Sequence, residues 1–285
     1  MKKLLLVLFL LMAGLLIYQL LVRRGTKTLP SGRGERIISL SPTLTEVLFA
    51  LGEGEQIVGV TRYCTYPPEA KSKEKVGDFL NPDLEKITQL RPDLVLAERW
   101  SSTKIVNRLR GMGISVVEIP SPQSIHEIYE AIQTVGEDIG KSEQARAIVA
   151  DMQRRVDIVT RRAANLSRQP SIYIEIDLPS WTVGRASYTH EAVTLCGARN
   201  IFGDVEKAAL LVSREAIIQR NPEVILSFEA SADQIRRRPG WGEISAVRHG
   251  RIIDHFDRDL FSRGNQRLVE GMEKFQVRFE ALMRE

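Results

Sequence analysis

Cysteine and histidine are scarce in this chain. Its 285 residues include only two cysteines, Cys64 and Cys196, and four histidines. Two cysteines cannot form the disulfide framework that stabilises small secreted domains, so we expect both to be free thiols. The histidines show no metal-ligand spacing with cysteine or acidic residues, which argues against a dedicated metal site. We therefore expect no metal and no other resident cofactor.

Motifs of the common catalytic classes are also missing. The sequence contains no G-x-G-x-x-G, no Walker loop, no G-x-S-x-G and no H-E-x-x-H. Cys64 has no convincing histidine partner that could activate it as a nucleophile. An enzyme of two α/β lobes that carries metal clusters would need more cysteines than two. We predict that the protein is not an enzyme.

A charge excess is absent once the first residues are set aside. The chain has 40 basic and 36 acidic residues, and residues 1–24 hold four of the basic residues and none of the acidic ones. The remainder is formally neutral. Because nucleic-acid binding needs a strongly basic surface, we expect no nucleic-acid partner.

One long hydrophobic run occurs, at the N-terminus. Leu4–Val22 is interrupted by a single polar residue, Gln19, and basic pairs flank it. Its length is close to the ~20 residues that a membrane-spanning helix needs, and no A-x-A site or lipid-accepting cysteine follows. We predict an uncleaved signal anchor at residues 1–25 and a tether at residues 26–35. A cleaved signal peptide is the main alternative, and a buried helix is another.

The chain repeats one pattern at an offset of 130 positions. Residues 81–97 (NPDLEKITQLRPDLVLA) resemble residues 213–227 (SREAIIQRNPEVILS). In each copy an N-capping residue, Asp83 or Ser213, precedes a short helix, and a proline-marked break and an apolar run of strand length follow. Each copy therefore predicts a helix followed by a strand.

A second, weaker similarity within the chain relates residues 45–60 to residues 189–205 and aligns Gly52 with Gly197. Two copies do not make a solenoid, so we expect two α/β lobes of similar design. Strands alternate with helices in both halves, which favours mostly parallel sheets. We place the lobes at residues 36–140 and 169–285.

The segment between the lobes, residues 141–168, has the pattern of one long helix. Apolar residues recur every three or four positions from Ala145 to Ala163. At 1.5 Å per residue, such a helix would be about 40 Å long and could run beside both lobes. We predict a rigid connecting helix. Loops are expected at residues 61–70 and 179–188.

Candidate binding residues follow the predicted strands, because open parallel sheets bind ligands at the carboxyl ends of their strands. The aromatic rings among them could instead fill the lobe cores, and the Asp259–Arg263 pair could be an ordinary ion pair at a helix start. The candidates are Ser41, Tyr63, Phe79, Trp181, Asp259 and Arg263.

Six segments together suggest a known family. They read RIISLSPTLTEVLFALG, VGVTRYCTYPPEA, VGDFLNPDLEKITQLRPDLVLA, CGARNIF, VSREAIIQRNPEVIL and DLFSRGNQRLVEG. They resemble the ABC-transporter substrate-binding proteins, in the class of cobalamin, siderophore and haem receptors, over about residues 36–282. The resemblance implies a periplasmic, monomeric protein that captures a small molecule between two lobes and delivers it to a permease and ATPase complex.

The same resemblance implies roles for single residues. Tyr63, Phe79 and Trp181 match aromatic positions that flank the corrinoid in the cobalamin-binding members of the class. Asp259 and Arg263 match polar residues that contact it. A cobalamin-like corrinoid is therefore the expected ligand.

Two departures keep other ligands open. Ala209 and Glu98 stand where the cobalamin-binding pattern has tryptophans. Haem or a ferric siderophore is thus an alternative ligand, and a membrane-anchored sensor on the same fold is an alternative function.

The resemblance also assigns Glu85 and Glu215, one in each lobe, to the glutamates that dock on arginines of the permease. The alternative reading is local, because a carboxylate in the first turn complements the helix dipole.

We predict that the hydrophobic segment stays on the mature protein, because no cleavage site follows it. N-terminal sequencing of protein extracted from membranes should begin at or near Met1. A first residue between Leu21 and Ser31 would contradict this.

Overall fold

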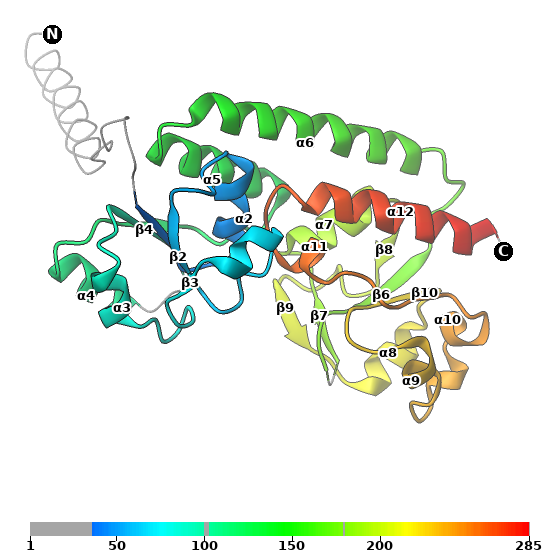
Figure 1. The fold of residues 1–285 in the computed structure, drawn as a ribbon. Coiled ribbons are helices and arrows are strands. Elements are labelled where there is room, and N and C mark those ends of the chain that lie inside the picture. Colours follow the sequence, from blue (N-terminus) through cyan, green and yellow to red (C-terminus); the bar gives the residue numbers. More distant parts are fainter. Residues whose placement is uncertain (1–35, 100–102, 179, 285) are drawn as a thin grey trace, which may run out of the picture.

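The computed structural model describes residues 36–99, 103–178 and 180–284 (Figure 1). The expected anchor and tether, residues 1–35, lie outside the described residues. Within the described ranges, no helix combines the length and the apolar character needed to cross a membrane.

A five-stranded parallel sheet organises the first half of the chain. Its strand order is β3-β2-β1-β4-β5, and β4 is buried along its whole length. The strands are β1 (Ile37–Ser39), β2 (Ile57–Val60), β3 (Glu74–Lys75), β4 (Leu94–Glu98) and β5 (Val116–Ile119). The helices are α2 (Pro42–Ala50), α3 (Leu84–Gln89), α4 (Thr103–Gly111) and α5 (Ile125–Asp138), with a 3-10 turn at Pro68–Ser72.

A four-stranded parallel sheet, in the order β11-β10-β6-β8, organises the second half, beside an antiparallel pair of β7 and β9. The strands are β6 (Ser171–Glu175), β7 (Trp181–Val183), β8 (Arg199–Asn200), β9 (Ala209–Leu211), β10 (Val224–Ser227) and β11 (Ile252–Ile253). The helices are α7 (Tyr188–Leu195), α8 (Arg214–Arg220), α9 (Ala232–Arg236), α10 (Ser245–Arg248), α11 (Asp259–Ser262) and α12 (Leu268–Arg284), with a 3-10 turn at Trp241–Glu243. The expected α/β fold with mostly parallel sheets is confirmed.

Helix α6 (Ser142–Ala163) runs along the top of the view in Figure 1, between the two halves in sequence. Its 22 residues make it about 33 Å long, shorter than expected, because the chain turns where Leu166 N donates to Ala163 O at 3.0 Å. Helix α12 lies beside it. Arg155 donates to both oxygens of Glu273 at 2.9 and 2.6 Å, which ties α6 to the C-terminal helix.

The repeat seen in the sequence is a structural repeat. Helix α3 leads to β4 in one half, and α8 leads to β10 in the other. The Asp83 carboxylate accepts a hydrogen bond from Lys86 N at 3.0 Å, and the Ser213 hydroxyl accepts one from Ala216 N at 3.1 Å. Both expected N-caps are confirmed.

Three local predictions need correction. The expected loop at residues 179–188 contains β7, which forms because its partner β9 returns after α7 and β8. The loop at residues 61–70 runs into the 3-10 turn, which a proline begins. Ser121 followed by Pro122 has the pattern of a cap and a first-turn proline, which predicts a helix start there. The helix starts instead at Ile125, because Ser124 caps it.

Candidate functional site

Residues from both halves of the chain line a cavity of about 640 Å³. It lies where the loops after β1, β2 and β4 meet the loop region around α11, that is, at the carboxyl ends of the strands, where such folds bind ligands. The structure brings five of the six candidate binding residues to this cavity. They are Ser41, Tyr63, Phe79, Asp259 and Arg263.

The aromatic candidates of the first half, Tyr63 and Phe79, are not buried in the hydrophobic core. Tyr63 is 49% exposed, and its ring centroid lies 6.1 Å from that of Phe79, with the two planes tilted by 45°. Partly exposed tyrosine and phenylalanine rings at a cavity present apolar faces on which a flat ligand could stack. Their role as ligand contacts stays a prediction.

Trp181 lies in an adjoining cavity of about 410 Å³, not in the larger one. Both cavities share Tyr188, Arg258 and Ser262 as lining residues. Trp181 begins β7, pairs with Leu211 of β9 and is 40% exposed. The polar neighbours Ser180 and Thr182 predict an exposed ring, and the structure confirms it. The strand pairing that holds the ring is a feature the sequence did not indicate.

The Ser41 hydroxyl already has two structural partners. It accepts a hydrogen bond from Leu44 N at 3.4 Å as the N-cap of α2, and it donates to Glu98 Oε1 at 2.9 Å. Ser41 is 1% exposed and Glu98 is 7% exposed. The sequence analysis named Glu98 only as the replacement of a tryptophan in the cobalamin-binding pattern, and the structure places it in the cavity lining.

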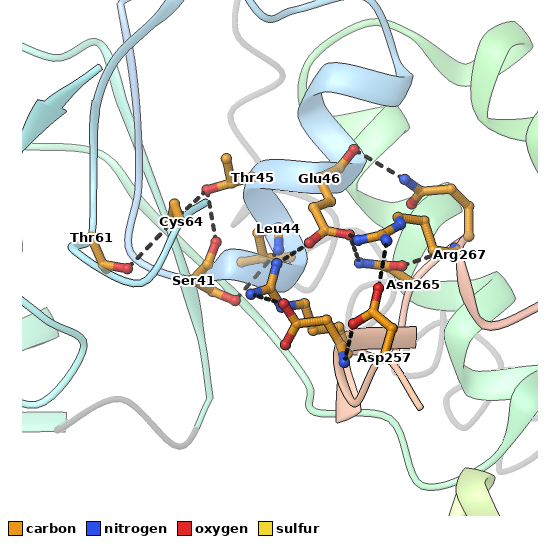
Figure 2. Close-up of polar contacts among 12 residues, drawn as sticks. Ser41, Leu44, Thr45, Glu46, Thr61, Cys64, Asp257, Asn265 and Arg267 are labelled. Atoms are coloured by element: carbon orange, nitrogen blue, oxygen red, sulfur yellow. Dashed lines mark hydrogen bonds and ion pairs between the residues drawn. The ribbon is translucent and has the colours of Figure 1, made fainter. Parts of the chain in front are cut away.

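Both cysteines are free thiols, as expected, and both are buried. Cys64 Sγ lies 3.2 Å from Thr45 Oγ1 and 3.1 Å from Thr61 Oγ1 (Figure 2). Burial raises the pKa of the Cys196 thiol, which disfavours the reactive thiolate. Among the residues that the structure describes, no group of three or more histidine, cysteine or acidic side chains could hold a metal ion.

The most consequential side chain of this region is Glu46 of α2, which the sequence reasoning missed. Its side chain is fully buried, and it points toward a segment of the second half (Figure 2). Its carboxylate pairs with Arg263, accepts from Asn265 Nδ2 at 2.9 Å and from Arg267 Nη1 at 3.3 Å. Two guanidinium groups and an amide offset the large cost of burying this charge. We call Glu46, Arg263, Asn265 and Arg267 the Glu46 clamp.

The expected Asp259–Arg263 ion pair is present, with its Nη2 and Oδ2 atoms 2.6 Å apart. It is not an ordinary surface pair, because the Arg263 side chain is only 11% exposed and also bonds Glu46. Arg267 in turn lies 3.7 Å from the centroid of the Tyr66 ring. The clamp thus joins the cavity wall to the loop that carries Tyr63 and Tyr66.

One signal in the sequence could have revealed Glu46. It is the only charged residue in α2, and it lies among the buried positions of that helix. A buried carboxylate needs cationic partners, and DLFSRGNQR offers two arginines. Close approach of the halves also depends on Gly264, because a Cβ there would lie 2.6 Å from Pro122 Cγ.

Glu85 and Glu215 occupy equivalent first-turn positions of α3 and α8 and are exposed. Glu85 Oε1 accepts from Gln89 Nε2 at 3.2 Å, and Glu215 Oε1 accepts from Arg214 Nη2 at 3.2 Å. Hydrogen bonds from its own backbone amide and from Arg214 lower the pKa of Glu215. Their docking role stays a prediction.

Comparison with known proteins decides the family. The model of a periplasmic binding protein family matches residues 37–257. The chain belongs to the periplasmic binding protein family. This family binds solutes and is not enzymatic, and membership implies an extracytoplasmic location.

Individual relatives cover most of the chain. The uncharacterized ABC transporter substrate-binding lipoprotein YvrC of Bacillus subtilis is 36% identical over 248 residues, 84% of this chain and 78% of that protein. The vitamin B12-binding protein of Vibrio cholerae is 30% identical over 247 residues, 84% of this chain and 87% of that protein. A solved structure of a possible iron-binding, periplasmic solute-binding protein from Staphylococcus epidermidis has a TM-score of 0.76 and 31% identity, and the match covers 86% of this chain and 99% of that one.

We predict that Glu46→Gln destabilises the folded protein by about 3–5 kcal/mol, because it leaves the nearly buried Arg263 and Arg267 without their shared carboxylate. Urea denaturation of the full chain in detergent measures the loss. Glu273→Gln is the matched control, because it removes a half-exposed partner of Arg155 and should cost about 1 kcal/mol or less. Equal losses in the two variants would show that the clamp has no special role.

Proposed function

We propose that this protein is the extracytoplasmic substrate-binding component of an ABC importer, and that it captures a cobalamin-like corrinoid between its two halves. One observation carries the proposal: a single cavity, lined from both halves, combines partly exposed aromatic rings with a few polar groups. A large flat ligand that is apolar on its faces and polar at its rim needs this combination.

The residues divide into two roles in this proposal. Tyr63 and Phe79 in the larger cavity and Trp181 in the adjoining one offer ring faces for the macrocycle. Ser41 and the Asp259–Arg263 pair offer hydrogen bonds to amide groups at its rim. Because the Glu46 clamp and α6 hold the halves together, the cleft is largely preformed, and closure on the ligand is small.

The choice of a corrinoid has support from two directions. The sequence matches three aromatic and two polar positions of the cobalamin-binding pattern, with Ala209 and Glu98 in place of two of its tryptophans, and one relative is named a vitamin B12-binding protein. Another is named a possible iron-binding protein, which keeps haem and ferric siderophores as the competing ligands. Delivery to a permease and ATPase, and anchoring to the inner membrane by residues 1–25, belong to the same proposal.

Calorimetric titration of the full chain in detergent tests the ligand. We expect cyanocobalamin to bind, and we expect Trp181→Ala and Asp259→Ala each to weaken binding by about 1–3 kcal/mol, through loss of one ring face or one charged hydrogen bond. Haemin and a ferric hydroxamate siderophore serve as competing ligands.

Val277→Ala and Asp233→Ala are the controls, because both residues are exposed and line neither cavity. They should leave the affinity unchanged. Binding of haemin or siderophore alone would reject the corrinoid. Unchanged affinity in Trp181→Ala and Asp259→Ala, with the fold intact, would place the site elsewhere.

Glu85 and Glu215 are proposed to dock on the two halves of the permease. Helices α3 and α8 lie low in Figure 1, one in each half, away from α6 at the top. Charges at the edge of an interface act mainly on the rate of encounter. We expect the Glu85→Gln/Glu215→Gln variant to bind ligand normally yet to fail in uptake by cells.

The matched control is Glu127→Gln/Glu143→Gln, which removes exposed first-turn carboxylates from α5 and α6. It changes the net charge equally and should support normal uptake. Normal uptake by the Glu85/Glu215 variant as well would leave these glutamates with the helix-dipole role only, worth about 0.3–1 kcal/mol of stability each.

A further inference from the structure

Every arginine that lines the larger cavity is already paired with a carboxylate. The cavity's described lining includes three arginines and no lysine. The pairs are Arg62 with Asp78 at 3.0 Å, Arg258 with Glu229, and Arg263 with both Glu46 and Asp259.

Arg263 is the most firmly committed of the three. Its side chain is 11% exposed, and carboxylates occupy both ends of its guanidinium fork. An anionic ligand group could reach it only by displacing Asp259 or breaking the buried bond to Glu46. Breaking the bond to Glu46 would take one of its two cationic partners from a fully buried carboxylate, which is costly.

Arg62 and Arg258 are about half exposed, at 59% and 47%, so their ion pairs are weaker individually. Their partners still neutralise them. Asp78 is fixed in place, because its Oδ1 atom accepts from Leu80 N at 3.0 Å and from Asn81 N at 2.8 Å. The Asp78 carboxylate that faces Arg62 is therefore held in position by the turn that follows it.

The balance of charge around the cavity is negative. Glu98 adds a further buried carboxylate to the lining. The lining itself holds three arginines and two carboxylates, those of Glu98 and Asp259. When the ion-pair partners of these arginines are also counted, five carboxylates stand against three arginines, because Arg267, the other cationic partner of Glu46, has a second carboxylate of its own in Asp257. These carboxylates are Glu46, Asp78, Glu98, Glu229 and Asp259. Sites that recognise a carboxylate or phosphate ligand instead present arginine or lysine side chains that are not paired with carboxylates of the protein itself.

We propose that the cavity selects a macrocycle whose rim is uncharged and amide-like over one whose rim carries carboxylates, and that Asp78 and Glu229 determine this specificity by neutralising Arg62 and Arg258. The inference rests on the proposed function and extends it from the ring to the charge of its substituents. Amide groups can bridge paired arginines and carboxylates, because an amide both donates and accepts hydrogen bonds. Carboxylates only accept, and they meet like charge in this cavity.

Two matched pairs of ligands test the charge preference separately from the ring. Dicyanocobinamide and dicyanocobyrinic acid share the corrin ring, with side chains that are mainly amides in the first and carboxylates in the second. Haemin dimethyl ester and haemin share the porphyrin ring, with esters in the first and carboxylates in the second. Full chain in detergent is titrated with each, and we expect the uncharged member of a bound pair to bind at least about tenfold tighter, since like charges brought together are strongly unfavourable.

The variant Asp78→Asn/Glu229→Gln tests the two assigned residues. The substituted amide at position 78 keeps an oxygen that can accept the hydrogen bonds of the turn, while Arg62 and Arg258 lose their charged partners. In this variant, we expect the ratio of the affinities for the uncharged and the carboxylate member of a pair to fall by about tenfold or more. Binding of the carboxylate member should become more sensitive to salt. The control Asp204→Asn/Asp233→Asn removes two exposed partners of Arg220 and Arg236, away from the cavity, and should leave the preference unchanged.

The outcomes separate the two proposals. Tighter binding of cobinamide than of cobyrinic acid supports both. A preference for haemin dimethyl ester over haemin, with no corrinoid bound, rejects the corrinoid and supports the charge preference. Equal or tighter binding of the carboxylate member of a pair overturns the charge preference, and so does an unaltered preference in Asp78→Asn/Glu229→Gln. Absence of binding by all four rejects both.

Discussion

The arrangement of the two halves depends on a carboxylate that neither half could bury alone. Glu46 comes from the helix after the first strand, and its partners Arg263 and Arg267 come from the segment before the last helix. Separating the halves would take both cationic partners from Glu46, and it would take from Arg263 and Arg267 the carboxylate that they share. The clamp therefore fixes where the loops of the two sheets meet, and the cavity follows from that meeting.

Helix α6 imposes a second constraint on the same geometry. Besides the Arg155–Glu273 pair, Gln276 Nε2 donates to Val159 O at 2.8 Å, so α6 and the C-terminal helix form one buried seam. Motion of one half against the other must disturb this seam or the clamp. A protein held at both places gains affinity by presenting its aromatic faces in advance, because little ordering remains to oppose binding.

The sequence predicted those features whose signals are local. Each of these signals lies within a few residues, and the structure confirms them. They are the caps Asp83 and Ser213, the glycines Gly52 and Gly197 that follow two helices, and the alternation of helices and strands. The sequence could not predict β7, because the partner strand β9 is distant along the chain. It could not predict the Glu46 clamp either, because Glu46 and Arg263 are 217 positions apart. The resemblance predicted that Asp259 and Arg263 belong to the site. It did not predict the second carboxylate on Arg263, which comes from Glu46 in the other half.

The most direct test of this account is a crystal structure of the protein with bound dicyanocobinamide. The account predicts the corrin ring in the larger cavity against Tyr63, with the ligand reaching Trp181 in the adjoining cavity, and with the Glu46 bonds to Arg263, Asn265 and Arg267 unbroken. The two sheets should keep their relative orientation within a small closure. A ligand bound outside this cavity, or a complex in which Glu46 has separated from both arginines, would contradict it.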